Sequence, residues 1–227
     1  MCVPGCWLGD RTLTVSHNKV LHVGCGGYAP EKLHPRFRGA DWHEVRLDID
    51  PDAKPDIVAS MTDMAGVQTG SMNAVFSSHN LEHLYPHQVP MALAEFRRVL
   101  APSGFALITL PDLQSVAQLV AEGKATEPAY MSQLGPISPL DILYGFGPAL
   151  ARNNLFMAHH TGFTGQSLLE ALSNAGFAYS VVQRNPASFA LWAIGFANTP
   201  TDEDLSEATD AMLPINMALK ASRLVMV

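Results

Sequence analysis

Cysteine is scarce in this chain, which has only Cys2, Cys6 and Cys25 among its 227 residues. Three cysteines cannot build the paired framework that stabilises small secreted proteins. Cys2 and Cys6 offer at most half of a metal site. We therefore expect a protein without disulfides that works in a reducing compartment, the cytoplasm.

Basic residues are also few, and long apolar runs are missing. Lys and Arg total 14 against 21 Asp and Glu, which gives a formal charge of −7, and no basic stripe marks a nucleic-acid surface. No apolar run approaches the roughly 18 residues of a membrane span, and the first residues lack a basic n-region. We expect a soluble protein that acts on a small-molecule or sugar-type substrate, with neither nucleic acid nor membrane as partner.

Apolar residues are plentiful in shorter segments, since 48% of the chain is hydrophobic. The most informative of these segments is V-L-H-V-G-C-G-G at residues 20–27, an apolar run that ends in glycines. Glycine adopts the positive φ angles of a sharp strand exit, and a side chain at Gly24 or Gly26 would keep a ligand away from the backbone. The segment predicts a nucleotide-like cofactor at the end of a first strand, with a plain turn as the alternative.

The next strand-like segment, residues 44–51, ends in acidic residues. Asp48 follows Gly26 by 22 positions. In nucleotide-binding α/β sheets, a carboxylate at about this offset lies at the tip of the second strand and accepts hydrogen bonds from ribose hydroxyls. We predict this role for Asp48 and a turn position for Asp50.

With these two features in place, the sequence resembles the class I S-adenosylmethionine-dependent methyltransferases. It is most similar to the methyltransferase type 11-like group that has a Leu-Glu-His motif after the fourth strand. Five segments between about residues 19 and 196 carry the resemblance in order: V-L-H-V-G-C-G-G, V-R-L-D-I-D-P, M-N-A-V-F-S-S-H-N-L-E-H-L, E-F-R-R-V-L-A-P-S-G-F-A-L-I-T-L-P-D and T-G-F-T-G-Q-S-L-L-E-A-L-S-N-A-G-F.

This resemblance implies a Rossmann-like α/β fold and S-adenosylmethionine as the cofactor. The sheet would have seven strands, mostly parallel with an antiparallel C-terminal strand, and helices on both faces. Asp63 could bind the adenine amine, although Thr62 or Asp63 could instead cap a turn. The cofactor residues implied in this way are Gly24, Cys25, Gly26, Asp48, Ile49, Met61, Thr62, Asp63 and Ser78.

Two other functions are compatible with the same segments. An NAD-dependent oxidoreductase would use Gly24, Gly26 and Ala29 as a loose dinucleotide fingerprint, but its pyrophosphate needs a helix that begins directly at the loop. Pro30 and Pro35 interrupt that stretch. The third reading is a relative of the fold that binds a ligand without chemistry.

The string H-N-L-E-H at residues 79–83 also fits the H-x-x-E-H pattern of a family of zinc peptidases. On a long helix, His79 and His83 would share a face and hold zinc, with Glu82 as base. However, the string follows a strand, and Pro86 leaves room for about one turn only. We therefore expect no zinc, and no metal in the site.

The sequence offers fewer constraints on the residues that bind the acceptor and on the residue that takes its proton. His79 is the first candidate for a general base, because it directly follows the fourth strand and imidazole titrates near neutral pH. The long stretch from Pro111 to Gly165, rich in glycine, proline and aromatics, is predicted to be a substrate lid. Its candidate substrate residues are Tyr144, His159 and His160.

We expect one domain over residues 1–227, in four parts. Residues 19–110 form the cofactor-binding half, 111–165 the lid or insertion, and 166–200 the part that closes the sheet. Residues 201–227 are predicted to be a helical tail with an apolar helix from Met212 to Val227. This tail could pack on the domain or on a second copy of the chain, as a homodimer.

Overall fold

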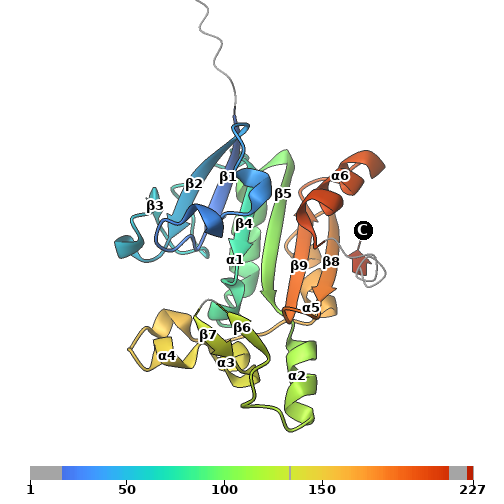
Figure 1. Ribbon diagram of the computed structural model, residues 1–227. Helices are drawn as coiled ribbons and strands as arrows, with labels where there is room; N and C mark the ends of the chain where they lie inside the picture. Colours follow the sequence, from blue (N-terminus) through green and yellow to red (C-terminus); the bar gives the residue numbers. More distant parts are fainter. Residues whose placement is uncertain (1–16, 133, 215–223, 227) are drawn as a thin grey trace, which may run out of the picture.

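The computed structural model describes residues 17–132, 134–214 and 224–226. Their main feature is a sheet of eight strands in the order β10-β8-β9-β5-β4-β1-β2-β3 (Figure 1). The first five strands are parallel. They are β1 (Asn18–Val23), β2 (Trp42–Asp48), β3 (Ile57–Val58), β4 (Met72–Ser78) and β5 (Leu100–Pro111).

The strand order reverses beside β1. The chain runs from β1 outward to β2 and β3 and then returns to β4 on the other side of β1. In open α/β sheets, ligands bind in the crevice at the carboxyl ends of the strands where the order reverses. The fold therefore places the ligand site above the ends of β1, β2 and β4.

The antiparallel strands come from the C-terminal part. β8 (Tyr179–Asn185) and β9 (Ala190–Phe196) form a hairpin, and β9 pairs antiparallel with β5. This agrees with the predicted antiparallel end of the sheet.

An eighth strand at the sheet edge corrects two predictions. β10 (Leu224–Met226) pairs antiparallel with β8, so the sheet has eight strands and not seven. In the described part of the tail, the helix is α6 (Asp202–Met212). The predicted helix from Met212 to Val227 is wrong at residues 224–226, which form β10. These residues gain backbone hydrogen bonds by pairing with the edge of β8. Residues 215–223 and 227 of the predicted helix lie outside the described residues.

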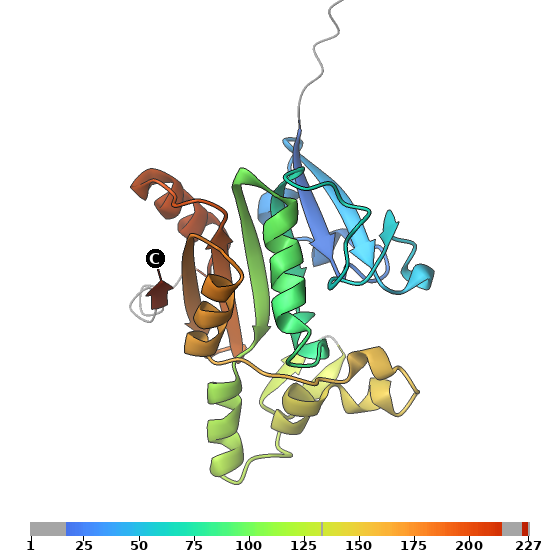
Figure 2. The ribbon, with the colours of Figure 1, turned by 180° about the vertical axis from the view of Figure 1, so that it is seen from behind.

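Helices cover both faces of the sheet. α1 (Val89–Val99) and α5 (Gly165–Asn174) pack side by side on one face (Figure 2). α1 buries Leu93 and Phe96 in the core on this face. Among the described residues, no helix has the length and hydrophobicity needed to cross a membrane.

The other face lacks a full helix between β1 and β2. Two three-residue 3-10 turns, η1 (Pro30–Lys32) and η2 (Pro35–Phe37), occupy the connection, each beginning at a proline. Proline has no N–H to donate and clashes with the preceding turn, so the predicted interruption of the first helix is confirmed. Phe37 from η2 and Met212 from α6 complete the core on this face.

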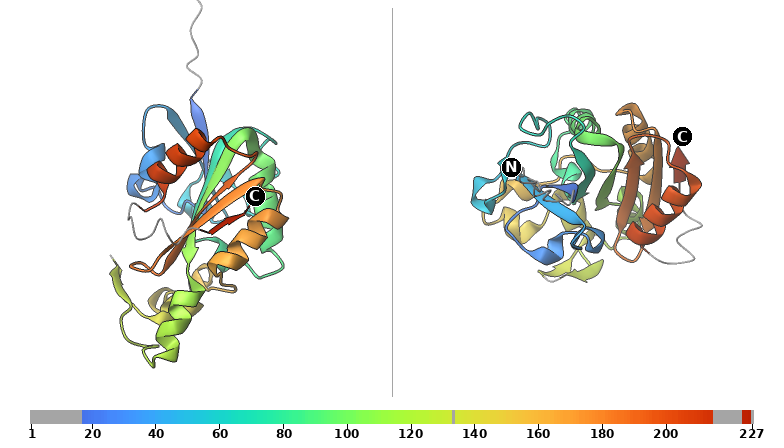
Figure 3. Two further views of the ribbon diagram at one scale, coloured as in Figure 1. Left: turned by 90° about the vertical axis from the view of Figure 1, so that its right-hand side faces the viewer. Right: turned by 90° about the horizontal axis from the view of Figure 1, so that it is seen from above.

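The predicted lid is a small folded unit beyond the carboxyl ends of the strands (Figures 1 and 3). It has its own core of Val116, Ile137 and Ile142. Its elements are α2 (Leu113–Ala121), β6 (Tyr130–Ser132), β7 (Gly135–Ile137), α3 (Pro139–Tyr144), α4 (Gly147–Leu150) and η5 (Leu155–Met157).

Candidate functional site

The glycine turn after β1 has the backbone that its sequence predicted. Gly24 and Gly26 have φ angles of 64° and 59°. Such angles cost other L-residues roughly 1 to 2 kcal/mol. The N–H groups of Gly24 and Cys25 both donate to Leu47 O, at 2.8 and 3.2 Å. The turn is therefore attached to the end of β2, where the predicted ribose ligand lies.

The Asn80 side chain packs against this turn and binds the strand ends beside it, a role that the sequence did not indicate. Its Nδ2 donates to Val23 O at 2.9 Å and to Ser78 O at 3.1 Å, and its side chain is buried. A Cβ atom at Gly24 would overlap with the Asn80 amide. Only the pairing of β1 with β4 brings these two residues together, so no local pattern could have identified Asn80.

Asp48 lies at the tip of β2 and is 9% exposed. Its Oδ2 accepts the N–H of Gly26 at 2.7 Å, and its Oδ1 accepts the N–H of Asp50 at 2.9 Å. Each carboxylate oxygen can accept more than one hydrogen bond. Asp48 can therefore hold the glycine turn and also accept from a ligand.

Arg46 is a second support that the sequence did not indicate. Its Nη2 donates to Gly26 O at 2.5 Å and its Nη1 to Lys54 O at 2.9 Å. The guanidinium also lies over the Tyr28 ring, 5.5 Å from its centroid. The glycine turn is thus held at Gly26 by both its N–H and its carbonyl group.

A cavity of about 610 Å³ lies over this turn, within the size range of small-molecule and cofactor sites. Ile49, 53% exposed, and Leu155 and Phe156 from η5 line it with apolar side chains. Thr62 and Asp63 do not line the cavity, whereas their neighbour Ser60 does. The predicted cofactor residues that line it are Gly24, Cys25, Gly26, Asp48, Ile49, Met61 and Ser78.

The three predicted substrate residues line a second cavity of about 200 Å³. Tyr144, His159 and His160 face Glu82 there, with Leu113, Val116 and Ile142 completing the wall. His160 lines both cavities. The two cavities are therefore neighbours, one large and one small.

Part of the chain matches a known protein family. Residues 21–108 match the profile of the family described as "Methyltransferase domain". They contain the glycine turn, Asp48 and the segment from His79 to His83. This part of the chain is therefore a methyltransferase domain. A search of curated proteins gave no match.

Solved structures share the fold of this methyltransferase at low sequence identity. A SAM-dependent methyltransferase from Archaeoglobus fulgidus is 13% identical with a TM-score of 0.53, over 79% of this chain and 86% of that one. One from Methanosarcina mazei is 12% identical with a TM-score of 0.52, over 81% and 94%. A Thermotoga maritima protein, described as a possible histamine N-methyltransferase, is 11% identical with a TM-score of 0.51, over 81% and 83%.

His79 of the methyltransferase lines the larger cavity, directly after β4. Its φ angle is 54°, in the left-handed region that non-glycine residues seldom occupy, and its N–H donates to Thr109 O at 2.8 Å. Strained backbone of this kind clusters at functional sites. The side chain is 51% exposed, and its Nδ1 lies 3.2 Å from Oε1 of the buried Glu82.

The contact with Glu82 changes the pKa of both groups. Desolvation of the half-exposed ring alone would lower the pKa of His79, but the hydrogen bond to Glu82 and the negative charge of that carboxylate raise it above its ordinary value. Burial alone would raise the pKa of Glu82, yet His79 and His83 lower it. Glu82 therefore stays ionised although it is only 1% exposed, and its Oε1 orients the His79 ring.

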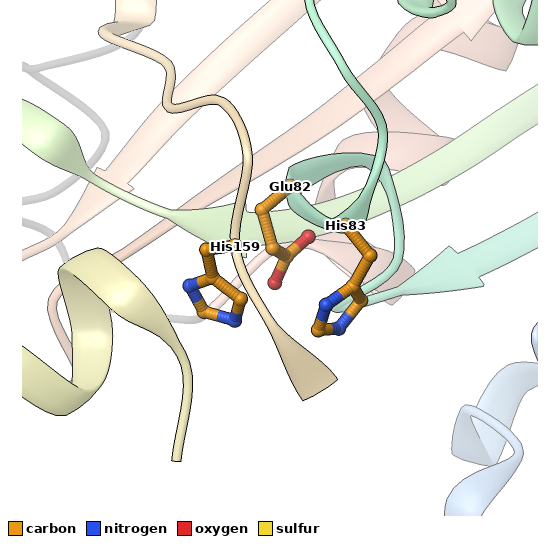
Figure 4. A group of neighbouring side chains, drawn as sticks. All are labelled: Glu82, His83 and His159. Carbon is orange, nitrogen blue, oxygen red and sulfur yellow. The ribbon is translucent and has the colours of Figure 1, made fainter. Parts of the chain in front are cut away.

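The H-N-L-E-H string forms no helical zinc motif. Only Leu81–His83 is helical, as the 3-10 turn η4, and the left-handed backbone of His79 excludes it from that turn. His79 and His83 therefore do not share a helical face, as the short spacing to Pro86 predicted. The lid instead brings His159 beside Glu82 and His83 (Figure 4).

Backbone hydrogen bonds join the lid to η4 at this point. The N–H groups of His160 and Thr161 both donate to Glu82 O, at 2.8 and 3.2 Å. The His160 ring stacks on Tyr85 with centroids 4.2 Å apart. Burial lowers the pKa of His159 more than the Glu82 charge raises it, so the His159 imidazole is neutral at neutral pH.

Proposed function

We propose that this methyltransferase transfers a methyl group to a small-molecule or sugar-type acceptor that binds in the smaller cavity. The observation that carries the proposal is the pair of adjoining cavities. The larger one has the glycine turn and Asp48 at the reversal of strand order, and the smaller one has a volume of about 200 Å³, below the usual range for drug-sized ligands. We assign the lid, residues 111–165, to the acceptor.

S-adenosylmethionine would supply an activated methyl group, carried on a sulfonium, for transfer to the acceptor. The residues of the larger cavity fit this cofactor: the Asp48 carboxylate suits a ribose diol, and Ile49 and Met61 offer apolar surface to a base. The protein's task is then to align the acceptor and exclude water. Leu155 and Phe156 of the lid line the same cavity.

His79 is the proposed general base. Because its Nδ1 contacts Glu82, Nδ1 carries the hydrogen and Nε2 has the lone pair. Nε2 would take the proton of an acceptor hydroxyl as the new C–O bond forms, which leaves the neutral ether, the thioether product and a protonated His79. The Glu82 carboxylate stabilises that positive charge.

Calorimetry tests the cofactor assignment first. We expect S-adenosylmethionine and its demethylated product to bind with micromolar dissociation constants, and NAD to give no heat of binding. The reason is that a pyrophosphate needs the free N–H groups of a helix that starts at the loop, and η1 has three residues only. Tight NAD binding with no response to S-adenosylmethionine would overturn the assignment in favour of an oxidoreductase. Binding without transfer to any acceptor would favour the non-catalytic relative.

An NMR titration of the histidines tests the His79 assignment before an acceptor is identified. We expect Glu82→Gln to lower the pKa of His79, because the variant keeps the side-chain shape and removes the negative charge that raises the pKa. His79 would then stay neutral down to a lower pH in the variant. The fall in activity on the acid side of the pH profile would shift to lower pH as well. His34 is the internal control, since burial holds its pKa at about 4. An unchanged His79 titration would exclude Glu82 as its partner.

A further inference from the structure

The Glu82 carboxylate is the starting observation. Its Oε1 contacts His79, whereas no described residue donates a hydrogen bond to its buried Oε2. An ionised carboxylate in a buried position is costly unless each oxygen has a partner. Oε2 therefore calls for a positively charged or hydrogen-bonding ligand that the protein chain itself does not supply.

Two imidazoles beside Glu82 are held in an orientation that suits such a ligand. His83 Nδ1 lies 3.0 Å from Ala158 O, and His159 Nδ1 lies 2.8 Å from Ile142 O. A carbonyl oxygen can only accept, so both Nδ1 atoms carry the hydrogen and both Nε2 atoms have the lone pair. Histidines that bind metals are oriented in this way, by donating the other ring N–H to a carbonyl or carboxylate.

One candidate ligand atom from each of Glu82, His83 and His159 lies within 4.8 Å of the other two. Figure 4 shows the Glu82 carboxylate between the two imidazole rings. Bonds of about 2.1 Å to a tetrahedral ion place ligand atoms roughly 3.4 Å apart. Modest side-chain rotation closes the difference, because the backbone bonds of His160 and Thr161 to Glu82 already hold the lid against η4.

We infer that Glu82, His83 and His159 bind one divalent transition-metal ion, with Zn²⁺ as the best match to two imidazoles and one carboxylate. This donor set suits Zn²⁺, whereas Mg²⁺ and Ca²⁺ prefer oxygen ligands. The inference replaces the expectation from sequence that the site holds no metal. That expectation considered His79 and His83 as the histidine pair and rested on Pro86 and the strand before them, whereas the trio contains His159 in place of His79.

Three protein ligands leave a coordination position open. Glu82 and His159 line the smaller cavity, and His83 lines the larger one, so the ion would lie at the boundary between acceptor and cofactor. An acceptor oxygen could occupy the open position, which favours acceptors with a hydroxyl group. This part of the inference rests on the proposed function, whereas metal binding itself does not.

The test is a Zn²⁺ titration of chelator-treated protein, followed by calorimetry and by thermal unfolding with and without Zn²⁺. We expect the wild type to bind about one Zn²⁺ per chain and to unfold at a higher temperature when loaded. His159→Ala should weaken Zn²⁺ binding at least tenfold, the loss typical of a damaged metal site. His160→Ala is the matched control, because His160 stacks on Tyr85 and lies outside the trio; it should bind Zn²⁺ as the wild type does.

Binding of the demethylated cofactor product, measured on the same proteins, separates this inference from the proposed function. His159→Ala should bind the product as the wild type does, which also shows that the variant is folded. If the wild type takes up no Zn²⁺, or if His159→Ala and the wild type bind it equally, the metal site is wrong. Failure of all proteins to bind the product would instead overturn the cofactor assignment and leave the metal result standing.

Discussion

Replacing Gly24 with alanine should weaken binding of S-adenosylmethionine by roughly a hundredfold, or about 3 kcal/mol. Two costs add up to this loss. The φ angle of 64° costs an L-residue roughly 1 to 2 kcal/mol. The new Cβ also displaces the Asn80 amide, whose hydrogen bonds to Val23 O and Ser78 O contribute about 1 kcal/mol each. The turn relaxes away from the position that suits the cofactor.

Gly27→Ala provides the matched control. It lies in the same turn, but its φ angle is not positive and a Cβ there meets no atom within 4 Å. We expect this variant to bind S-adenosylmethionine like the wild type and to unfold at the same temperature. Calorimetry and thermal unfolding of the two variants measure the difference. Equal affinities for Gly24→Ala and Gly27→Ala would show that the cofactor does not approach the turn.

Asp48→Ala should weaken cofactor binding by about 1.5 to 3 kcal/mol, the range for hydrogen bonds to a charged group. Part of the loss comes from the hydrogen bonds that the ribose hydroxyls would donate to the carboxylate. The rest comes from the turn, because the Gly26 N–H loses its 2.7 Å partner. Titration calorimetry with S-adenosylmethionine gives the dissociation constant of the variant directly.

Asp50→Ala is the comparison for this prediction. The Asp50 Oδ1 accepts the N–H of Asp52 and caps η3 (Pro51–Ala53), so its carboxylate is used within the turn. We expect a much smaller loss of affinity than in Asp48→Ala. The reverse order of the two variants would move the ribose contact from Asp48 to Asp50.

Features that depend on neighbours along the chain were predictable from the sequence. The positive φ angles of Gly24 and Gly26, the carboxylate at the end of β2 and the prolines that interrupt the first helix are local properties of the backbone. The one apolar face of α1 is also local, since Val89, Leu93 and Phe96 recur at three- to four-residue spacing. These local features indicated a nucleotide-like cofactor at the end of the first strand, and the resemblance to the methyltransferases implied the fold and S-adenosylmethionine.

The tertiary structure decided everything that depends on contacts between distant segments. Asn80 lies below Gly24 because β4 pairs with β1, and Thr62 and Asp63 fall outside the cavity wall although their segment borders it. Residues 224–226 pair with β8 as a strand, where the sequence alone predicted a helix. His159 joins Glu82 and His83 only because the lid packs on η4. Spacing along the chain carries no information on such contacts, because they form when separate elements pack and bury their polar groups together.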